Sequence, residues 1–229
     1  MARKLKSDRL MFIATLLLVC TSVVMVYSAS AVLAMERHHQ PYLYLFKQTT
    51  WVLLGLLLVP IVMRIDYRRY RDPRVIWAGL AIVAVALLAV LLRPEINGAR
   101  RWLVLGPFGV QPSELAKLVV ILFTAALLER RMDRIGEPSY ALLPIAVVVA
   151  GVVGLILAQP DLGTAVTVLM IAGLMVFAAG IGYSYVAGLV LLSVPALYFL
   201  LMTSEYRRRR VTAFLNPWED PLGGGFQII

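Results

Sequence analysis

The chain has 229 residues, of which 61% are hydrophobic and 15% are charged, and its mean hydropathy is +0.83. A chain of this composition does not fold as a water-soluble domain. Its formal net charge of +9 suits contact with anionic lipid. The sequence has no basic arm and no groove with interleaved aromatic residues, so it gives no reason to expect a nucleic-acid partner.

Seven apolar stretches follow one another along the chain, most of them close to the ~20 residues that cross a bilayer as a helix. The expected spans are 10–34, 49–63, 75–92, 113–128, 141–158, 164–181 and 185–202. The stretches lack the alternation of strands, and lipid permits only helices or closed barrels. The predicted fold class is therefore all-α, a polytopic transmembrane helical bundle in which residues 1–229 form a single membrane domain.

The cations indicate the orientation of these helices, because short loops rich in Lys and Arg stay in the cytoplasm. Twelve of the 22 Lys and Arg residues fall in the N-terminal segment and in the loops after the second and fourth stretches, so the N-terminus is expected in the cytoplasm. The first stretch exceeds the ~7–15 apolar residues of a signal peptide, which favours an uncleaved anchor over a cleaved leader. Nine further cations fall in outer loops, either as side chains that snorkel to lipid headgroups or as a site for an anionic ligand.

The outer loop 93–112 departs from plain lipid-facing chemistry. It contains the turn formers Asn97-Gly98 beside an apolar Trp102, so we expect it to fold back onto the membrane. The fourth stretch follows, and its Glu114 and Lys117 lie three residues apart on one helix face. They form either a structural pair or part of a site, because ionisable residues in membrane helices usually face a cavity or the bundle interior.

Two further segments carry charge at the expected outer side. Asp161 lies in the short link between the fifth and sixth stretches, where it either caps the sixth helix or serves as a functional acid. After the seventh stretch, the cationic run Arg207–Arg210 precedes Glu219 and Asp220 in a segment rich in Pro and Gly. Guanidinium groups bind phosphate through a planar fork, so these outer arginines suit a diphosphate at the membrane surface.

The sequence offers little that would identify a cofactor. The single Cys20 excludes an intramolecular disulfide, and the adjacent His38 and His39 have no Cys or carboxylate cluster beside them. No Walker or dinucleotide-binding glycine pattern occurs. A divalent cation could assist chemistry at a diphosphate, but no ligand spacing identifies one, and the cofactor is left unknown.

Four segments together resemble the SEDS family of shape, elongation, division and sporulation proteins. They are Asn97-Gly98-Ala99-Arg100-Arg101-Trp102, Gln111-Pro112-Ser113-Glu114-Leu115-Ala116-Lys117, Pro160-Asp161-Leu162-Gly163-Thr164-Ala165 and Asn216-Pro217-Trp218-Glu219-Asp220-Pro221. The resemblance covers essentially the whole chain, and its last segment is closer to the division members than to the elongation members. It implies a peptidoglycan glycosyltransferase that polymerises lipid II, an undecaprenyl-diphosphate-linked disaccharide-pentapeptide, at the outer face of the bacterial cytoplasmic (inner) membrane during cell division.

The resemblance also implies roles for particular residues. Asp220 is expected to be the catalytic base, with the adjacent Glu219 secondary. The charge and position of other residues, rather than the resemblance, give the expected substrate-binding residues, which are Arg101, Glu114, Lys117, Asp161, Arg207, Arg208, Arg209 and Arg210. The outer segments 93–112 and 203–229 are therefore expected to form the site together.

The same resemblance implies protein partners and a longer protein. The expected partners are a class B penicillin-binding protein that acts as transpeptidase, together with other division proteins. Because members of the family have about ten spans, we expect this chain to be a fragment of a longer protein. The residues alone also suit a flippase for the lipid-linked precursor or a scaffold for division proteins, and these remain the alternatives.

Overall fold

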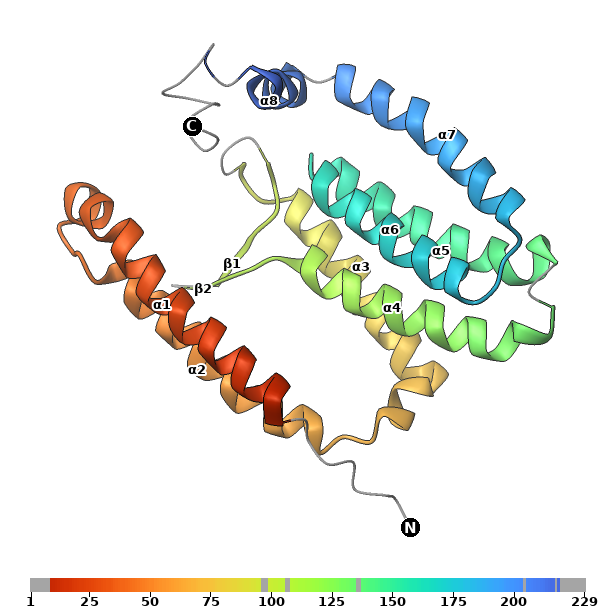
Figure 1. The fold of residues 1–229 in the computed structure, drawn as a ribbon, viewed down its shortest axis with the longest axis horizontal. Coiled ribbons are helices and arrows are strands. Elements are labelled where there is room, and N and C mark those ends of the chain that lie inside the picture. Colours follow the sequence, from red (N-terminus) through yellow and green to blue (C-terminus); the bar gives the residue numbers. More distant parts are fainter. Residues whose placement is uncertain are drawn as a thin grey trace. The chain divides into compact units, whose positions relative to one another are not determined.

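The structure is a computed structural model that describes residues 9–95, 99–105, 108–134, 137–203, 205–216 and 218. It is helical apart from one short hairpin within these residues (Figure 1). Its elements are α1 (Arg9–His38), α2 (Leu43–Met63), η1 (Tyr67–Arg71), α3 (Pro73–Leu91), β1 (Leu103–Leu105), β2 (Phe108–Val110), α4 (Pro112–Arg131), η2 (Met132–Arg134), α5 (Pro138–Ala158), α6 (Leu162–Ala178), α7 (Tyr183–Met202) and α8 (Glu205–Leu215). The chain divides into two units, residues 1–69 and residues 70–229, which are described separately.

Helices α1 to α7 correspond to the seven predicted apolar stretches, which confirms the all-α class. Among the described residues, α1, α2, α3 and α7 are both long enough and apolar enough to cross a membrane. The apolar parts of α5 and α6 are shorter, 142–158 and 162–178. Helix α4 has 20 residues but carries Glu114 and Lys117 near its start and a charged cluster at its end. The number of membrane spans therefore stays a prediction.

The first unit contains the helices α1 and α2, which lie side by side (Figure 1). Gln48 Nε2 donates a hydrogen bond to Ser22 Oγ at 3.4 Å, and the rings of Tyr27 and Tyr42 stack with centroids 5.7 Å apart. Among the described residues of this unit, Ala34 alone is buried. Such exposure of long apolar helices fits a solvent of lipid hydrocarbon rather than water.

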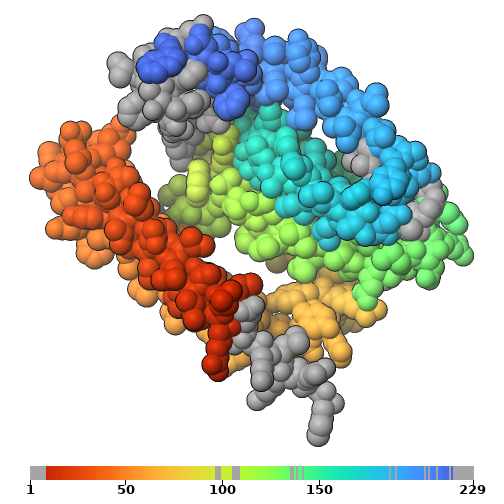
Figure 2. All heavy atoms as spheres, viewed as in Figure 1, coloured from red at the N-terminus to blue at the C-terminus, as the bar shows by residue number. Residues whose placement is uncertain are grey.

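The core of the second unit lies where α3, α4, α5 and α6 pack together. On α3 the buried residues recur every three or four positions, so that one face of the helix points into the core. These residues are Ile76, Leu80, Val83, Leu87 and Val90. Val83 and Leu87 belong to one apolar cluster with Val120, Ile156 and Val168 of the neighbouring helices, each of these three 0% exposed. Ile76 and Leu80 belong to a second cluster with Phe123 and Ala126 of α4. Helix α7 runs along the surface of this unit with mostly exposed side chains (blue in Figure 2).

Local sequence signals explain several helix ends in the second unit. Asp72 accepts a hydrogen bond from the Arg74 amide at 2.9 Å and so caps α3, with Pro73 at the first helical position. Helices α4 and α5 likewise begin with a proline. Gly180 has φ +94°, a left-handed conformation that favours glycine, directly after α6 ends.

The structure differs from the sequence-based expectation at the hairpin. No strand was expected, yet β1 and β2 pair antiparallel with Leu103 opposite Val110 and Val104 opposite Gly109. Each strand has three residues, too few for apolar and polar residues to alternate recognisably. A Cβ atom at Gly109 would lie only 3.2 Å from the Trp102 ring, so the absence of a side chain lets the indole approach the strand.

A second difference is α8, which occupies a segment that was expected to be a loop. Glu205 and Arg209 lie one turn apart and form an ion pair of 2.6 Å. The segment 205–215 contains neither Gly nor Pro, so nothing in it breaks a helix. The cationic run therefore lies on a helix, and the side chains of Arg207, Arg208 and Arg209 point in different directions around the helix axis.

Candidate functional site

The polar centre of the second unit is built on the short turn between α5 and α6. The amides of Gln159 and Asp161 both donate to the carbonyl of Ile156, at 3.1 and 3.3 Å. Asp161 then accepts hydrogen bonds from the Thr164 amide at 3.3 Å and from Thr164 Oγ1 at 2.7 Å. This confirms that Asp161 caps α6. The carboxylate thereby satisfies backbone and side-chain donors in the first turn of α6.

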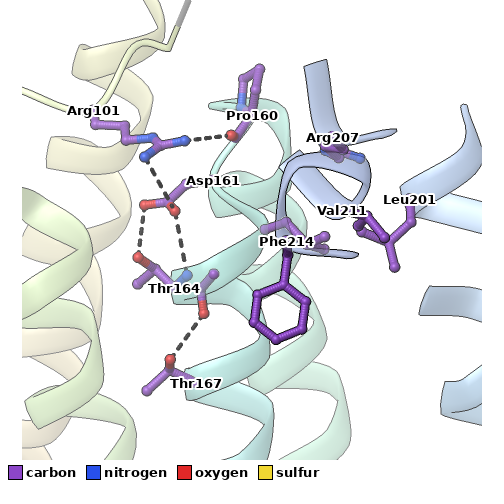
Figure 3. A pocket seen from close by; sticks show the side chains of 11 residues that line it. Arg101, Pro160, Asp161, Thr164, Thr167, Leu201, Arg207, Val211 and Phe214 are labelled. Carbon is purple, nitrogen blue, oxygen red and sulfur yellow. Dashed lines mark hydrogen bonds and ion pairs between the residues drawn. The ribbon is translucent and has the colours of Figure 1, made fainter. Parts of the chain in front are cut away.

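Arg101 approaches this turn from the segment before β1. Its Nη2 donates to the Pro160 carbonyl at 2.8 Å, and its Nη1 lies 3.8 Å from Asp161 Oδ1 (Figure 3). The Asp161 carboxylate is 5% exposed and the Arg101 side chain is 25% exposed, so the pair is partly shielded from solvent. Gln111 Nε2 donates to the other carboxylate oxygen at 3.2 Å. The turn, the loop and the start of α4 are thus joined through one acid.

A pocket of about 480 Å³ opens beside this cluster. It is lined by Arg101, Pro160, Asp161, Leu162, Gly163, Thr164, Thr167, Leu201, Arg207, Val211 and Phe214. Figure 3 shows Arg101 facing the turn, with the α8 residue Phe214 on the other side of the pocket. Arg207, Val211 and Phe214 follow one face of α8 at spacings of four and three residues.

The lining gives this pocket two kinds of surface. Arg101 and Arg207 contribute two guanidinium groups, whereas Leu201, Val211 and Phe214 contribute hydrocarbon. Arg207 is oriented by a hydrogen bond from its Nη1 to the Leu200 carbonyl at 2.9 Å. Such a pocket suits an amphiphile whose anionic group lies next to an apolar chain.

The structure brings together three of the predicted site residues, Arg101, Asp161 and Arg207, around this pocket. Glu114 and Lys117 form the expected ion pair, with Lys117 Nζ 2.8 Å from Glu114 Oε2, but neither lines the pocket. Their role in substrate binding stays a prediction.

The other predicted residues on and after α8 are divided. Arg208 is exposed and Arg209 pairs with Glu205, and neither lines the pocket. The side chain of Arg210 and the whole of Glu219 and Asp220 lie outside the described residues. The assignment of Asp220 as the base therefore stays a prediction.

Sequence reasoning assigned no role to several polar residues at this site, among them Gln111, Gln159, Thr164 and Thr167. A signal was present, because each lies at or near one end of an apolar stretch, where polar groups are scarce. Spacing alone could not say which partner each would find.

Two adjacent arginines in loop 93–112 also prove to differ. Arg100 donates from Nη1 to the Leu91 carbonyl at 3.1 Å, and its Nη2 pairs with Glu95 at 3.2 Å. It therefore satisfies the C-terminal end of α3. Arg101 points instead to the α5–α6 turn. This pair provides a natural control for mutagenesis.

The described residues contain no group of three or more His, Cys, Asp or Glu side chains that could hold a metal ion. Asp161 is the acid that lines the pocket among the described residues, and its oxygens contact Thr164, Gln111 and Arg101. The donors that the structure describes at this pocket therefore suit an anion better than a cation.

The chain matches a family model described as "Cell cycle protein" over residues 8–229. It is 40% identical over 226 residues to a protein of Geobacter metallireducens named "Probable peptidoglycan glycosyltransferase FtsW", covering 97% of this chain and 60% of the relative. It is 34% identical over 232 residues to "Stage V sporulation protein E" of Bacillus subtilis, covering 99% of this chain and 62% of the relative. The chain thus spans about 60% of the length of these curated relatives.

Solved structures are similar as well. A chain from a structure described as "Structural coordination of polymerization and crosslinking by a peptidoglycan synthase complex" matches with a TM-score of 0.65 and 35% identity, covering 92% of this chain and 62% of that chain. The rod shape determining protein RodA of Thermus thermophilus matches with a TM-score of 0.58 and 34% identity, covering 80% of this chain and 58% of that chain. Because the family model spans nearly the whole sequence, this chain belongs to the cell cycle protein family of FtsW, RodA and SpoVE.

Proposed function

We propose that the protein containing this chain is a peptidoglycan glycosyltransferase that polymerises lipid II into glycan strands during cell division. The observation that carries the proposal is the pocket in which Arg101 and Arg207 lie beside the apolar side chains of Leu201, Val211 and Phe214. Lipid II is an amphiphile with a diphosphate between its sugars and its polyprenyl chain. The two kinds of surface in the pocket match these two parts of the substrate.

In the proposed reaction, the C4 hydroxyl of a GlcNAc unit attacks C1 of the MurNAc on a second lipid-linked molecule. A new C–O bond forms at C1 while the bond from C1 to the diphosphate oxygen breaks. Undecaprenyl diphosphate leaves with the bonding electron pair, and the hydroxyl proton passes to a base. The reaction therefore needs a proton acceptor and a stabiliser for the negative charge on the leaving group.

Asp220 is the proposed base, on the strength of the family resemblance of its segment. A carboxylate can accept the hydroxyl proton as a general base. Arg101 and Arg207 are the proposed stabilisers of the diphosphate, and Asp161 orients Arg101 through the pair of 3.8 Å. Lys117, with its partner Glu114, is proposed to contact the substrate near the start of α4.

We further propose that this chemistry takes place at the outer face of the bacterial inner membrane, with the N-terminus in the cytoplasm. The cation distribution supports that orientation. A class B penicillin-binding protein is the proposed transpeptidase partner, alongside other division proteins. The similarity to a chain of a peptidoglycan synthase complex supports assembly with a partner protein.

The buried face of α4 favours surface chemistry over transport of the precursor across the membrane. After Lys117, the buried residues of α4 include the apolar Val120 and Phe123. Thr124 is the polar residue among the buried residues described there. A path for a diphosphate-linked sugar needs a continuous polar lining. The flippase alternative therefore lacks support in this part of the bundle.

The test uses the full-length protein in liposomes that contain lipid II, with polymerisation and flipping measured separately. Polymerisation without flipping is expected. Asp220→Asn should abolish polymerisation while preserving expression, because it removes the basic oxygen and retains the size of the side chain. Glu219→Gln is the matched control and should retain most of the activity. Flipping without polymerisation would contradict the proposal, and an Asp220→Asn variant with wild-type polymerisation would remove Asp220 as the base.

A further inference from the structure

Gln159 is a buried polar side chain whose hydrogen bonds are only partly satisfied. It is 0% exposed, as are the apolar Leu87 and Ile156. Its Nε2 donates to the Leu87 carbonyl in α3 at 2.9 Å, whereas its Oε1 is buried with no hydrogen-bond partner in the part of the chain that the structure describes. A buried, unpaired amide oxygen costs free energy. Stabilisation of the fold alone is therefore a poor explanation for a glutamine at this position.

The place of Gln159 in the chain suggests another explanation. It is the first residue of the turn between α5 and α6, and the amides on either side of Pro160 share the Ile156 carbonyl. The Pro160 carbonyl then receives Arg101 Nη2 at 2.8 Å, and Asp161 faces Arg101 Nη1. The turn thus presents two acceptors to Arg101, and the Gln159 side chain ties this turn to α3.

We propose that Gln159 is a positioning residue, whose buried hydrogen bond to α3 fixes the turn that aims Arg101 into the pocket. Gln159 does not line the pocket itself and acts through Pro160 and Asp161. The inference rests on the proposed function wherever its test uses glycan synthesis. A displacement of about 1 Å in a group that contacts substrate can lower a rate ~10²-fold.

The variant that tests this role is Gln159→Met in the full-length protein. Methionine has a similar length, and it removes both the donor and the unpaired oxygen. The Leu87 carbonyl lies inside α3, where it also receives the helical N–H four residues later. Replacing the amide by an apolar group of the same shape should therefore leave the thermal midpoint close to wild type. Gln48→Met, at a half-buried glutamine of α2, is the matched control.

Two readouts separate a positioning role from a structural one. The first is a double-mutant cycle: Gln159→Met should lower the polymerisation rate ~10-fold in the wild-type background and much less in an Arg101→Lys background.

The second readout, thiol labelling, needs no enzymatic activity. Gly163 lines the pocket, and a Cβ atom added there would meet no neighbouring atom within 4 Å, so Gly163→Cys can report thiol labelling in a background without other reactive cysteines. Gln159→Met should change the labelling rate severalfold, and Gln48→Met should not.

Each outcome bears on the inference. The positioning role of Gln159 would be overturned if Gln159→Met showed wild-type labelling and polymerisation. It would also be overturned if Gln159→Met lowered the polymerisation rate by the same factor in the Arg101→Lys background as in the wild type. If methionine prevents folding, Gln159→Asn keeps the amide but shortens its reach, and it should give the same labelling change. A further outcome is that the wild-type protein forms no glycan while Gln159→Met still changes the labelling rate. That combination would support the role of Gln159 in fixing the turn and would contradict the proposed function.

Discussion

The two ends of α4 both gather charged side chains, yet they are built differently. Where α4 begins, Asp161 is 4% exposed, receives a hydrogen bond from Gln111 and pairs with Arg101. Where α4 ends, Arg71 and Glu129 pair at 3.1 Å while 62% and 50% of their side chains are exposed. Burial and convergence on one acid, rather than the number of charges, distinguish the two ends.

This difference predicts where mutations will matter. Exposed ion pairs contribute at most ~1 kcal/mol to stability, because water and salt screen them. A shielded guanidinium held by a turn keeps a fixed geometry and acts more strongly on a charge that develops during a reaction. We therefore expect effects on activity at the beginning of α4 and small effects on stability at its end.

Among the variants that compare these regions, the largest effect is expected for Arg101→Lys in the full-length protein. Lysine keeps the charge but loses the planar fork that reaches Pro160 and Asp161 together. Polymerisation of lipid II should fall ~10²-fold, with a near-normal thermal midpoint. Arg100→Lys is the matched neighbour and should stay within a few-fold of wild type. Equal losses in the two variants would mean that the loop, and not Arg101, determines activity.

A smaller effect is expected for Arg207→Gln on α8. The loss of one charged contact to a diphosphate, worth ~1.5–3 kcal/mol, should raise the KM for lipid II at least ~10-fold. Arg208→Gln removes the same charge from an exposed position of the same helix that does not line the pocket. Steady-state kinetics in liposomes give the KM for lipid II of both variants. An equal rise in KM would mean that Arg207 attracts the substrate only through its charge and not through a specific contact.

The double variant Glu114→Lys/Lys117→Glu tests the ion pair at the start of α4. The exchange keeps charge balance but places a cation in the first helical turn, which the helix dipole disfavours by ~0.3–1 kcal/mol. If the pair contacts substrate, polymerisation should fall severalfold while the protein stays folded. A folded variant with full activity would show that the pair is structural and would remove both residues from the site.

The smallest effect is expected at the other end of α4, for Glu129→Gln. The pair with Arg71 is exposed, and Arg130 also contacts this segment by donating to the Arg71 carbonyl at 3.0 Å. Polymerisation should be unchanged, and the thermal midpoint should shift by little more than the error of calorimetry. A loss of activity similar to that of Arg101→Lys would break the distinction between the two ends.

Part of this fold could be predicted from the sequence by simple rules. Apolar length identified the helices α1 to α7, and the spacing from Ile76 to Val90 marks one buried face of α3. The same rules missed β1, β2 and α8, because three-residue strands lack a recognisable period and a run of arginines lacks the apolar face of a helix. Apolar periodicity identifies segments that bury apolar side chains, and β1, β2 and α8 bury few of them.

The site was only partly predictable for a related reason. Asp161 as a helix cap and the pair of Glu114 with Lys117 are local features, and each was one of two alternatives that spacing offered. The contact of Arg101 with the α5–α6 turn joins residues 59 positions apart. No local pattern determines such a contact or tells Arg101 apart from Arg100. The fold is needed to assign them different roles.

The most direct test of the account asks what occupies the pocket between the α5–α6 turn and α8. A photoactivatable polyprenyl diphosphate, with the reactive group next to the diphosphate, is bound to the full-length protein in liposomes, and the labelled peptides are mapped by mass spectrometry. Labelling is expected in segments 161–167 and 201–214, and it should be competed by lipid II and lost in the Arg101→Lys/Arg207→Gln variant. Labelling confined to α1 and α2, or unchanged in that variant, would contradict it.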